Sequence, residues 1–284
     1  MVAACEDNPM EPESRPASAI APFGKPGSIP NKGLILFNSG SPEPQLYTVD
    51  PATKNVVQVP TGPGWFSAGS WNADYTKISY SGGLQVGLHM MNADGTGQTL
   101  LAAANGVRGS VFSPDGNYVA FIAYVGLDLQ VHTVEIASGN VVQLTNLTGV
   151  GQRVSWSPDG KRILFDQGGN LFTIAPDGTD LKQLTQCPVY CNDGHFSPDG
   201  KQIAFVHGGQ LARMTAAGTK LQMLTSLADP QPHWPSWSPD GKQLAYERYN
   251  GAYSHDVWVL NVANLSASAV VTSRLDDTTP SWTR

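Results

Sequence analysis

The stretch Trp156-Ser157-Pro158-Asp159-Gly160-Lys161 decides the fold, because its central tetrapeptide Ser-Pro-Asp-Gly occurs four times in the chain. Each copy directly follows an aromatic residue and shortly precedes an apolar run; the copies begin at Ser113, Ser157, Ser197 and Ser238. Ser and Pro at the first two positions suit a type I turn, and Gly at the fourth accepts the left-handed conformation that lets two strands leave as a hairpin. The aspartates are therefore turn residues, and four copies indicate one small unit stacked repeatedly.

The aromatic residues in front of these turns set the period of the repeat. The series runs at intervals of 41, 44, 40, 41 and 45 residues through Trp71, Phe112, Trp156, Phe196, Trp237 and Trp282. Each unit holds four short apolar strands, and four strands in about 40 to 45 residues is the period of a propeller blade.

The two ends of the repeat array complement each other. Residues 33–37 look like the second strand of a unit that lacks its aromatic strand, and residues 278–282 supply such a strand after the last complete unit. We expect the last strand to become the innermost strand of the first blade, which would abolish open sheet edges. The sequence therefore predicts an all-β fold over residues 33–284, a six-bladed β-propeller of four-stranded blades closed by its C-terminal strand.

These repeats resemble the TolB-like propeller family, which has the same aromatic-Ser-Pro-Asp-Gly-Lys motif before an apolar strand. The resemblance runs from about Gly33 to Arg284. The family includes a periplasmic component of the Tol-Pal envelope system, and it resembles propellers attached to peptidases and some polysaccharide lyases. The resemblance implies a bacterial envelope protein. The α/β domain that precedes the propeller of the Tol-Pal component is not seen in this sequence, so we do not expect the same choice of partner.

Composition excludes several classes of partner. From Gly33 onward the chain carries 19 acidic and 14 basic residues with no basic stripe, which argues against nucleic acid. No apolar run approaches the length of a membrane span. Phosphate-binding loops, nucleophile elbows and His-Glu-x-x-His motifs are missing, so we predict no cofactor and no catalytic metal. The propeller is expected to be a monomer.

Residues 1–32 differ from the rest of the chain. They carry six prolines and few large apolar side chains, which predicts a disordered tether. Small residues precede Cys5, as at the end of a bacterial lipoprotein signal. We therefore expect Cys5 to be lipidated, giving a periplasmic or outer-membrane-anchored lipoprotein that touches a membrane only through this anchor. The alternative is a chance cysteine in a flexible terminus.

Cys187 and Cys191 are the remaining cysteines. Three intervening residues permit a local disulfide, which an exported protein would form in an oxidising compartment. The alternative is two free thiols. A zinc site is disfavoured because no second Cys or His pair stands at ligand spacing.

Two faces of the propeller follow from the repeat. One, which we call the turn face, carries the uniform Ser-Pro-Asp-Gly turns. The other, the variable face, carries the blade-to-blade links and the turns between second and third strands, which differ between blades. Binding residues gather on variable loops of rigid scaffolds. The residues that break the repeat there, and that we expect to converge on the mouth of the central channel, are Trp65, Arg108, Arg153, Asp193, His195, His233, Trp234, Asp276 and Asp277.

Two functions fit such a mouth, which mixes aromatic, basic and acidic side chains. The first is a non-catalytic binding or scaffold module that presents the variable face to an envelope protein, a peptide or a glycan. The second is a propeller enzyme, a polysaccharide lyase or a hydrolase, in which His233, His195, Arg153 and Asp276 or Asp277 would act at the channel mouth.

Overall fold

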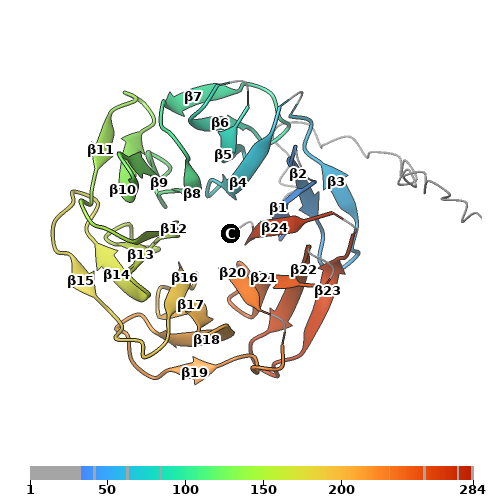
Figure 1. Cartoon of the computed structure of the whole chain (residues 1–284). Helices are drawn as coiled ribbons and strands as arrows, with labels where there is room; N and C mark the ends of the chain where they lie inside the picture. Colours follow the sequence, from blue (N-terminus) through green and yellow to red (C-terminus); the bar gives the residue numbers. More distant parts are fainter. Residues whose placement is uncertain are drawn as a thin grey trace, which may run out of the picture.

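A computed structural model describes residues 33–40, 43–61, 64–83, 85–229, 231–251, 254–273 and 275–282. These residues form six four-stranded antiparallel sheets arranged around a central axis (Figure 1). The predicted six-bladed propeller is confirmed. The predicted tether, with Cys5, lies outside the described residues.

Each blade runs from an innermost strand at the channel to an outermost strand at the rim of the disc. The first blade is β24 (Asp277–Trp282), β1 (Ile35–Ser39), β2 (Gln45–Val49) and β3 (Val56–Gln58), and the second is β4 (Phe66–Trp71), β5 (Lys77–Gly82), β6 (Leu88–Asn92) and β7 (Thr99–Ala102). The third is β8 (Arg108–Phe112), β9 (Tyr118–Val125), β10 (Asp128–Glu135) and β11 (Val141–Gln143), and the fourth is β12 (Val150–Trp156), β13 (Ile163–Gln167), β14 (Asn170–Ile174) and β15 (Lys182–Gln183). The fifth is β16 (Cys191–Phe196), β17 (Gln202–His207), β18 (Gln210–Thr215) and β19 (Gln222–Met223), and the sixth is β20 (Pro232–Trp237), β21 (Gln243–Tyr249), β22 (His255–Asn261) and β23 (Ala267–Val271).

The ring closes through the two ends of the repeat array, as predicted. β24 pairs antiparallel with β1, and Ile35 lies opposite Trp282 in the register. The indole Nε1 of Trp282 donates to the Gly33 carbonyl at 3.0 Å, and its backbone N–H donates to Ser236 Oγ at 3.0 Å. The last strand is therefore fastened both to the first blade and to the sixth.

The Ser-Pro-Asp-Gly turns share one hydrogen-bond pattern, illustrated by the copy at Ser157. The Gly160 N–H donates to the Ser157 carbonyl at 2.9 Å, which closes the turn. The Ser157 hydroxyl donates to the Asp159 carboxylate and accepts the Arg162 N–H. Gly160 has φ of 71°, the left-handed conformation that favours glycine. The serine and aspartate thus stabilise the turn from within.

Apolar clusters fill the spaces between neighbouring blades. Six such clusters are found among the described residues, and each joins one blade to the next. The repeat aromatics contribute to them, and Trp156 and Trp237 are almost completely buried. Burying a large side chain contributes roughly 1.5 to 3 kcal/mol, so the repeated aromatic position stabilises the contacts that hold the ring together.

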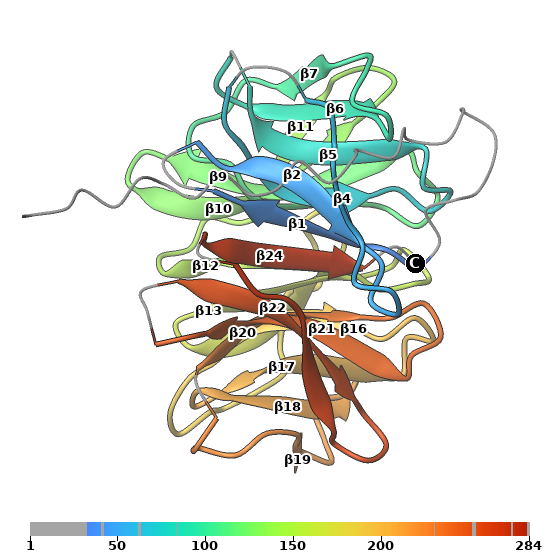
Figure 2. The ribbon, with the colours of Figure 1, turned by 90° about the vertical axis from the view of Figure 1, so that its right-hand side faces the viewer.

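The strand directions assign the loops to faces. β24 runs from left to right in Figure 2, so the links that lead into the innermost strands lie at the left of that view and the turns that follow these strands lie at the right. The variable face is thus the left edge of the disc in Figure 2. In the part of the chain that the structure describes, no helix has the length and apolar character needed to cross a membrane.

Candidate functional site

Every innermost strand carries an irregularity near the variable face, where its pairing with the second strand shifts register. The third residue before the repeat aromatic lies within this bulge. It has a positive φ in four blades: 43° at Gly109, 56° at Asp193, 55° at Trp234 and 51° at Thr279. Positive φ is uncommon for residues other than glycine, and a bulge re-aims the side chains of its strand. The repeat therefore builds one irregular position per blade around the channel.

Side chains of the innermost strands enclose a small cavity in the central channel. Residues from all six innermost strands line a cavity of about 40 Å³, among them Ser70, Ser110, Arg153, His195, Trp234 and Thr279. A cavity of this size has room for a few water molecules. Pockets for small-molecule ligands are typically about 300 to 1,000 Å³, so the channel itself does not offer one.

Four of the predicted residues come together at the channel. The Arg153 guanidinium lies over the Trp234 ring, 5.3 Å from its centroid. His233 Nδ1 lies 3.4 Å from Asp193 Oδ2, and the Trp234 backbone N–H donates to the same oxygen at 3.5 Å. Arg153 and Asp193 are buried, whereas His233 and Trp234 are half-buried. The fourth, fifth and sixth blades thus contribute one cluster of aromatic, basic and acidic groups.

Two buried acids complete this cluster, and sequence reasoning missed both. Asp166 on β13 and Glu247 on β21 each stand ten residues after a repeat tryptophan, where the third and fifth blades have Ile122 and Val206. Each acid fastens the bulge of the next blade. Asp166 accepts the backbone N–H of Asp193, and Glu247 Oε2 accepts that of Thr279 at 2.9 Å. An acid at a buried strand position, where the other blades have Ile122, Val206, Ser81 and Asn38, was the signal that could have found them.

The space beside Asp166 depends on a glycine. A Cβ atom added to Gly151 would lie 1.8 Å from Asp166 Oδ2. Only a residue without a side chain lets β12 pass this close to the carboxyl group. Gly151 therefore allows the buried acid to reach across to Asp193 of the fifth blade.

Burial dominates the electrostatics of the cluster. It raises the pKa of Asp166 to about 7, with a further contribution from the Asp193 charge. Burial likewise raises the pKa of Glu247 to about 7. Burial lowers the pKa of Arg153 to about 10, although Asp193 and Glu247 oppose this effect, so the guanidinium stays charged at neutral pH. The hydrogen bond to Asp193 raises the pKa of His233.

The other predicted residues lie elsewhere on the variable face. Trp65 is 41% exposed on the link before β4, and Arg108 bonds the carbonyl of Val107 beside it. Asp276 Oδ1 accepts hydrogen bonds from the backbone and the ring of His255, both at 2.9 Å. Asp277 is completely buried and accepts a hydrogen bond from Ser273 at 2.8 Å. The expected convergence of all nine residues on one mouth is therefore only partly seen.

His195 lies at the channel rather than on the rim. It is buried, lines the cavity, and its carbonyl accepts the indole N–H of Trp237 at 3.1 Å. The fourth and sixth blades have serine at this position. Ser155 and Ser236 there accept the backbone N–H of the next blade's aromatic residue. His195 thus replaces a residue that links blades and places an imidazole beside the cavity.

Exposed apolar side chains, which we call the exposed apolar rim, stand on the loops and strand ends of the variable face. Of the 16 large apolar residues exposed in the described chain, nine stand on loops or strand ends of the variable face. Leu127, in the β9–β10 turn, is 95% exposed, and Leu227, on the link before β20, is 79% exposed. The other seven are Trp65, Val86, Tyr124, Val125, Val189, Tyr190 and Leu275. Gathered exposed apolar surface marks interaction sites.

A larger hollow of about 1020 Å³ opens on the turn face between the fourth and fifth blades. Three of its five charged side chains bind one another, and the other two, Asp159 and Asp199, accept hydrogen bonds from Ser157 and Ser197. Asp180 Oδ2 lies 2.6 Å from Arg162 Nη1 and 2.8 Å from Lys182 Nζ. Because these charges are already paired on the surface, the hollow offers a ligand less than the variable face does.

Cys187 and Cys191 form a disulfide on the variable face, at the start of β16. Cys191 stands two residues before Asp193, so the bridge braces the strand that supplies this acid to the cluster. His207 lies against the bridge, with its Nδ1 3.1 Å from Cys191 Sγ.

Comparison of the sequence with known proteins finds TolB proteins as relatives. The sequence model of the TolB beta propeller domain matches residues 91–284. Over 80 residues the chain is 34% identical to the Tol-Pal system protein TolB of Francisella tularensis subsp. mediasiatica. The matched segment covers 26% of this chain and 18% of that relative. The chain thus spans less than a fifth of the length of the curated relative.

Solved structures share the fold at low sequence identity. TolB from Acinetobacter baumannii superimposes with a TM-score of 0.78 at 21% identity, covering 88% of this chain and 66% of that one. An oligogalacturonate lyase from Vibrio parahaemolyticus gives 0.54 at 16% identity, covering 85% and 74%. A TolB protein and a lyase therefore share this architecture, and the fold alone does not choose between a binding module and an enzyme.

Proposed function

The chain belongs to the TolB beta propeller domain family, and from this premise we propose that it is a non-catalytic binding module of the bacterial cell envelope. It presents its variable face to a protein partner. Among the protein, peptide and glycan ligands that the sequence left open, the surface favours a protein.

The exposed apolar rim carries this proposal. Protein interfaces combine apolar and aromatic contact area with a few polar anchors. Here the rim supplies the contact area over several blades, from Leu127 on the third to Leu227 before the sixth. A glycan or a small molecule would be expected to occupy a concave pocket, and the channel cavity of about 40 Å³ is too small for one.

The charged cluster at the channel gives the surface specificity. Trp234 is a side chain of a type that dominates binding energy; it is half-buried, and the buried Arg153 guanidinium lies against its ring. His233 and Asp193 place both signs of charge close to them. Charges arranged in this way select a complementary partner more than they raise the overall affinity.

The enzyme alternative has less support in the geometry. It requires His233, His195, Arg153 and one of Asp276 or Asp277 to act together. Asp277 is buried against Ser273, and Asp276 is paired with His255. The acids that do join Arg153 and His233 are Asp193 and Glu247.

Location in the envelope rests on three observations. The curated relative is named as a Tol-Pal system protein, the sequence around Cys5 resembles a lipidation site, and a disulfide suits an oxidising compartment. Gly33, which leads into β1, bonds Trp282 at the turn face. A lipid-anchored tether that joins the propeller there would leave the variable face free for its partner.

Photo-crosslinking in cells of the source organism tests the proposal. A photoreactive amino acid replaces Leu127 or Leu227 on the variable face, and Leu221 or Leu265 on the turn face serves as the matched control. These two controls are also exposed leucines. We expect a discrete crosslinked protein from positions 127 and 227 only.

Charge substitution gives the second arm of this experiment. Leu127→Asp and Leu227→Asp together should reduce crosslinking from a reporter at Trp65 at least tenfold, while the melting temperature stays unchanged. Leu221→Asp with Leu265→Asp should leave this crosslinking unchanged. Crosslinks from the turn face alone would show that the partner binds the opposite face and would overturn the proposal.

A further inference from the structure

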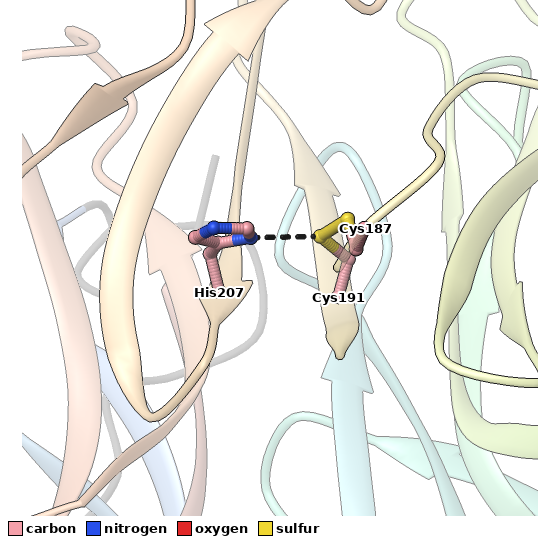
Figure 3. Close-up of side chains that lie close together, drawn as sticks. All are labelled: Cys187, Cys191 and His207. Carbon is pink, nitrogen blue, oxygen red and sulfur yellow. Dashed lines mark hydrogen bonds between the residues drawn. A yellow bond between two sulfur atoms is a disulfide. The ribbon is translucent and has the colours of Figure 1, made fainter. Parts of the chain in front are cut away.

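We propose that Cys187, Cys191 and His207 form a separate metal site, which binds a thiophilic divalent cation such as Zn²⁺ once the disulfide is reduced. The three residues are drawn in Figure 3. The site lies on the variable face, on the link that carries Val189 and Tyr190, but it uses none of the residues of the charged cluster.

The fold brings these ligands together without a sequence motif. Cys191 is the first residue of β16 and His207 is the last residue of β17, and the two lie directly opposite each other in the strand pair. Opposite residues of an antiparallel pair project to the same side of the sheet. Figure 3 shows the imidazole facing the two sulfur atoms. His207 supplies the third ligand that the cysteine spacing alone could not reveal.

The distances fit one metal ion. The two sulfur atoms and a ring nitrogen of His207 all lie within 4.8 Å of one another. Zinc binds Cys sulfur at about 2.3 Å and His nitrogen at about 2.0 to 2.1 Å, so ligand atoms of a tetrahedral site lie roughly 3.5 to 4 Å apart. Small side-chain rotations after the sulfurs separate would reach this geometry. Three protein ligands would leave the fourth position to water.

The backbone around the site is already fixed. The Cys191 N–H donates to the Gly169 carbonyl at 2.8 Å, and the Gly208 N–H donates to the Tyr190 carbonyl at 2.9 Å. These bonds tie the link before β16 both to the fourth blade and to the β17–β18 turn. The Cys187 N–H also donates to Asn170 Oδ1 at 2.8 Å, so the backbone holds all three ligands close together and only side-chain rotation is needed.

Reduction frees the ligands in two balanced steps. A dithiol reductant attacks through one thiolate at Cys187, which is half-exposed, because Cys191 is completely buried. The new mixed disulfide releases Cys191 as a thiolate. The second thiolate of the reductant then attacks its own bridged sulfur and releases Cys187. The reductant leaves as a disulfide, two electrons have passed to the protein, and the cation takes up both thiolates.

Cobalt absorption tests the site, in a Cys5→Ser background that removes the third cysteine. Reduced, anaerobic protein is titrated with Co²⁺, which reports thiolate ligands by charge-transfer absorption and four-coordinate geometry by its visible bands. We expect one equivalent to bind to the reduced protein and none to the oxidised protein. His207→Ala should weaken binding at least tenfold, and His255→Ala, a histidine elsewhere on the variable face, should not.

A second variant removes the dependence on reduction. Cys187→His cannot form the bridge and retains three ligands, so it should bind Co²⁺ without reductant, and Cys187→His with His207→Ala should not. Absence of the thiolate band in both the reduced protein and Cys187→His would overturn the proposal. Equal affinity with and without His207 would overturn it as well.

Discussion

The guanidinium of Arg153 on the fourth blade lies over the indole ring of Trp234 on the sixth blade, 5.3 Å from its centroid. The two residues come from blades that are not neighbours, and the blade between them supplies Asp193. Both side chains line the cavity in the channel, so their contact joins the fourth and sixth blades there. Because Arg153 is buried beside Asp193 and near Glu247, its charge also stabilises acids that have little access to water.

Removal of the Arg153 charge should destabilise the propeller. In Arg153→Met, Asp193 and Glu247 stay buried without their cation, and the loss of one partner from a buried charge group costs about 3 to 5 kcal/mol. Urea unfolding at pH 8 should show this loss. Arg213→Met, which removes an arginine bonded to Gln222 on the surface, should change stability by less than about 0.5 kcal/mol.

The cost of Arg153→Met should also depend on pH. Burial raises the pKa of Glu247 to about 7, so at pH 5 this acid is mostly protonated and needs the cation less. The difference between variant and wild type should therefore shrink between pH 8 and pH 5. A difference that stays constant over this range would show that Arg153 does not act through the charge of Glu247.

Ring closure predicts a large effect of Trp282→Ala. Trp282 packs in the apolar cluster between the first and sixth blades and bonds both of them. Truncation of a buried tryptophan costs about 3 to 5 kcal/mol, which lowers the melting temperature of a domain of this size by roughly 6 to 20 °C. Trp65→Ala, at an exposed tryptophan, should shift it by less than about 2 °C. Similar melting temperatures for the two variants would contradict closure through β24.

The fold could be predicted because its signal is repeated and local. Each Ser-Pro-Asp-Gly turn stands next to the strand ends that it joins, and six aromatic positions agree on one period. The half-units at the termini then decide how the ring closes. These predictions need only the spacing of motifs along the sequence, and the pairing of Ile35 with Trp282 follows from that spacing.

The candidate site was less predictable because it depends on the direction in which each side chain projects. Asp276 and Asp277 are adjacent in sequence, and successive residues of an extended chain project to opposite sides. They accordingly bind different partners, His255 and Ser273. Asp166 and Glu247 were missed because each accepts a hydrogen bond from the backbone in the bulge of the next blade. That contact exists only once the ring is assembled.

Membrane attachment through Cys5 remains a prediction. Expressed with its native leader in a bacterial host, the wild-type protein should sediment with membranes and dissolve in detergent. Cys5→Ser should be soluble or unprocessed, whereas Cys187→Ser should still sediment because it leaves Cys5 intact. Metabolic labelling with a fatty-acid analogue should follow the same pattern. A soluble wild-type protein without label would remove the lipoprotein hypothesis.

Glu247 should contribute less to the stability of the propeller as pH rises through the range from about 4.5 to 7, whereas His132, whose pKa burial lowers, acts in the opposite direction. In the unfolded chain Glu247 loses its proton near its ordinary pKa of 4.5, whereas in the folded protein burial delays this until about pH 7. The folded state therefore holds the proton more tightly, and this contribution to stability is full below pH 4.5 and lost by about pH 7. Asp166, whose pKa burial also raises to about 7, acts in the same direction. So does His233, because a raised histidine pKa stabilises the folded state only while the ring is protonated.

Glu247→Gln isolates one of these groups. The glutamine oxygen can still accept the Thr279 N–H, but it never ionises, so the variant should resemble wild type at pH 4 and exceed its stability at pH 8. The gain is at most about 3 kcal/mol, because one pKa unit corresponds to about 1.4 kcal/mol.

Asp159→Asn is the control. The hydrogen bond from Ser157 lowers the pKa of that acid, so its contribution to stability is full above about pH 5, and its loss there lowers the curve without changing the slope. Urea unfolding from pH 4 to pH 8 should therefore show a flatter profile for Glu247→Gln and a wild-type slope above pH 5 for Asp159→Asn. If the Glu247→Gln profile ran parallel to wild type, Glu247 would ionise as readily in the folded protein as in the unfolded chain, and the buried acid would not be a proton-binding site.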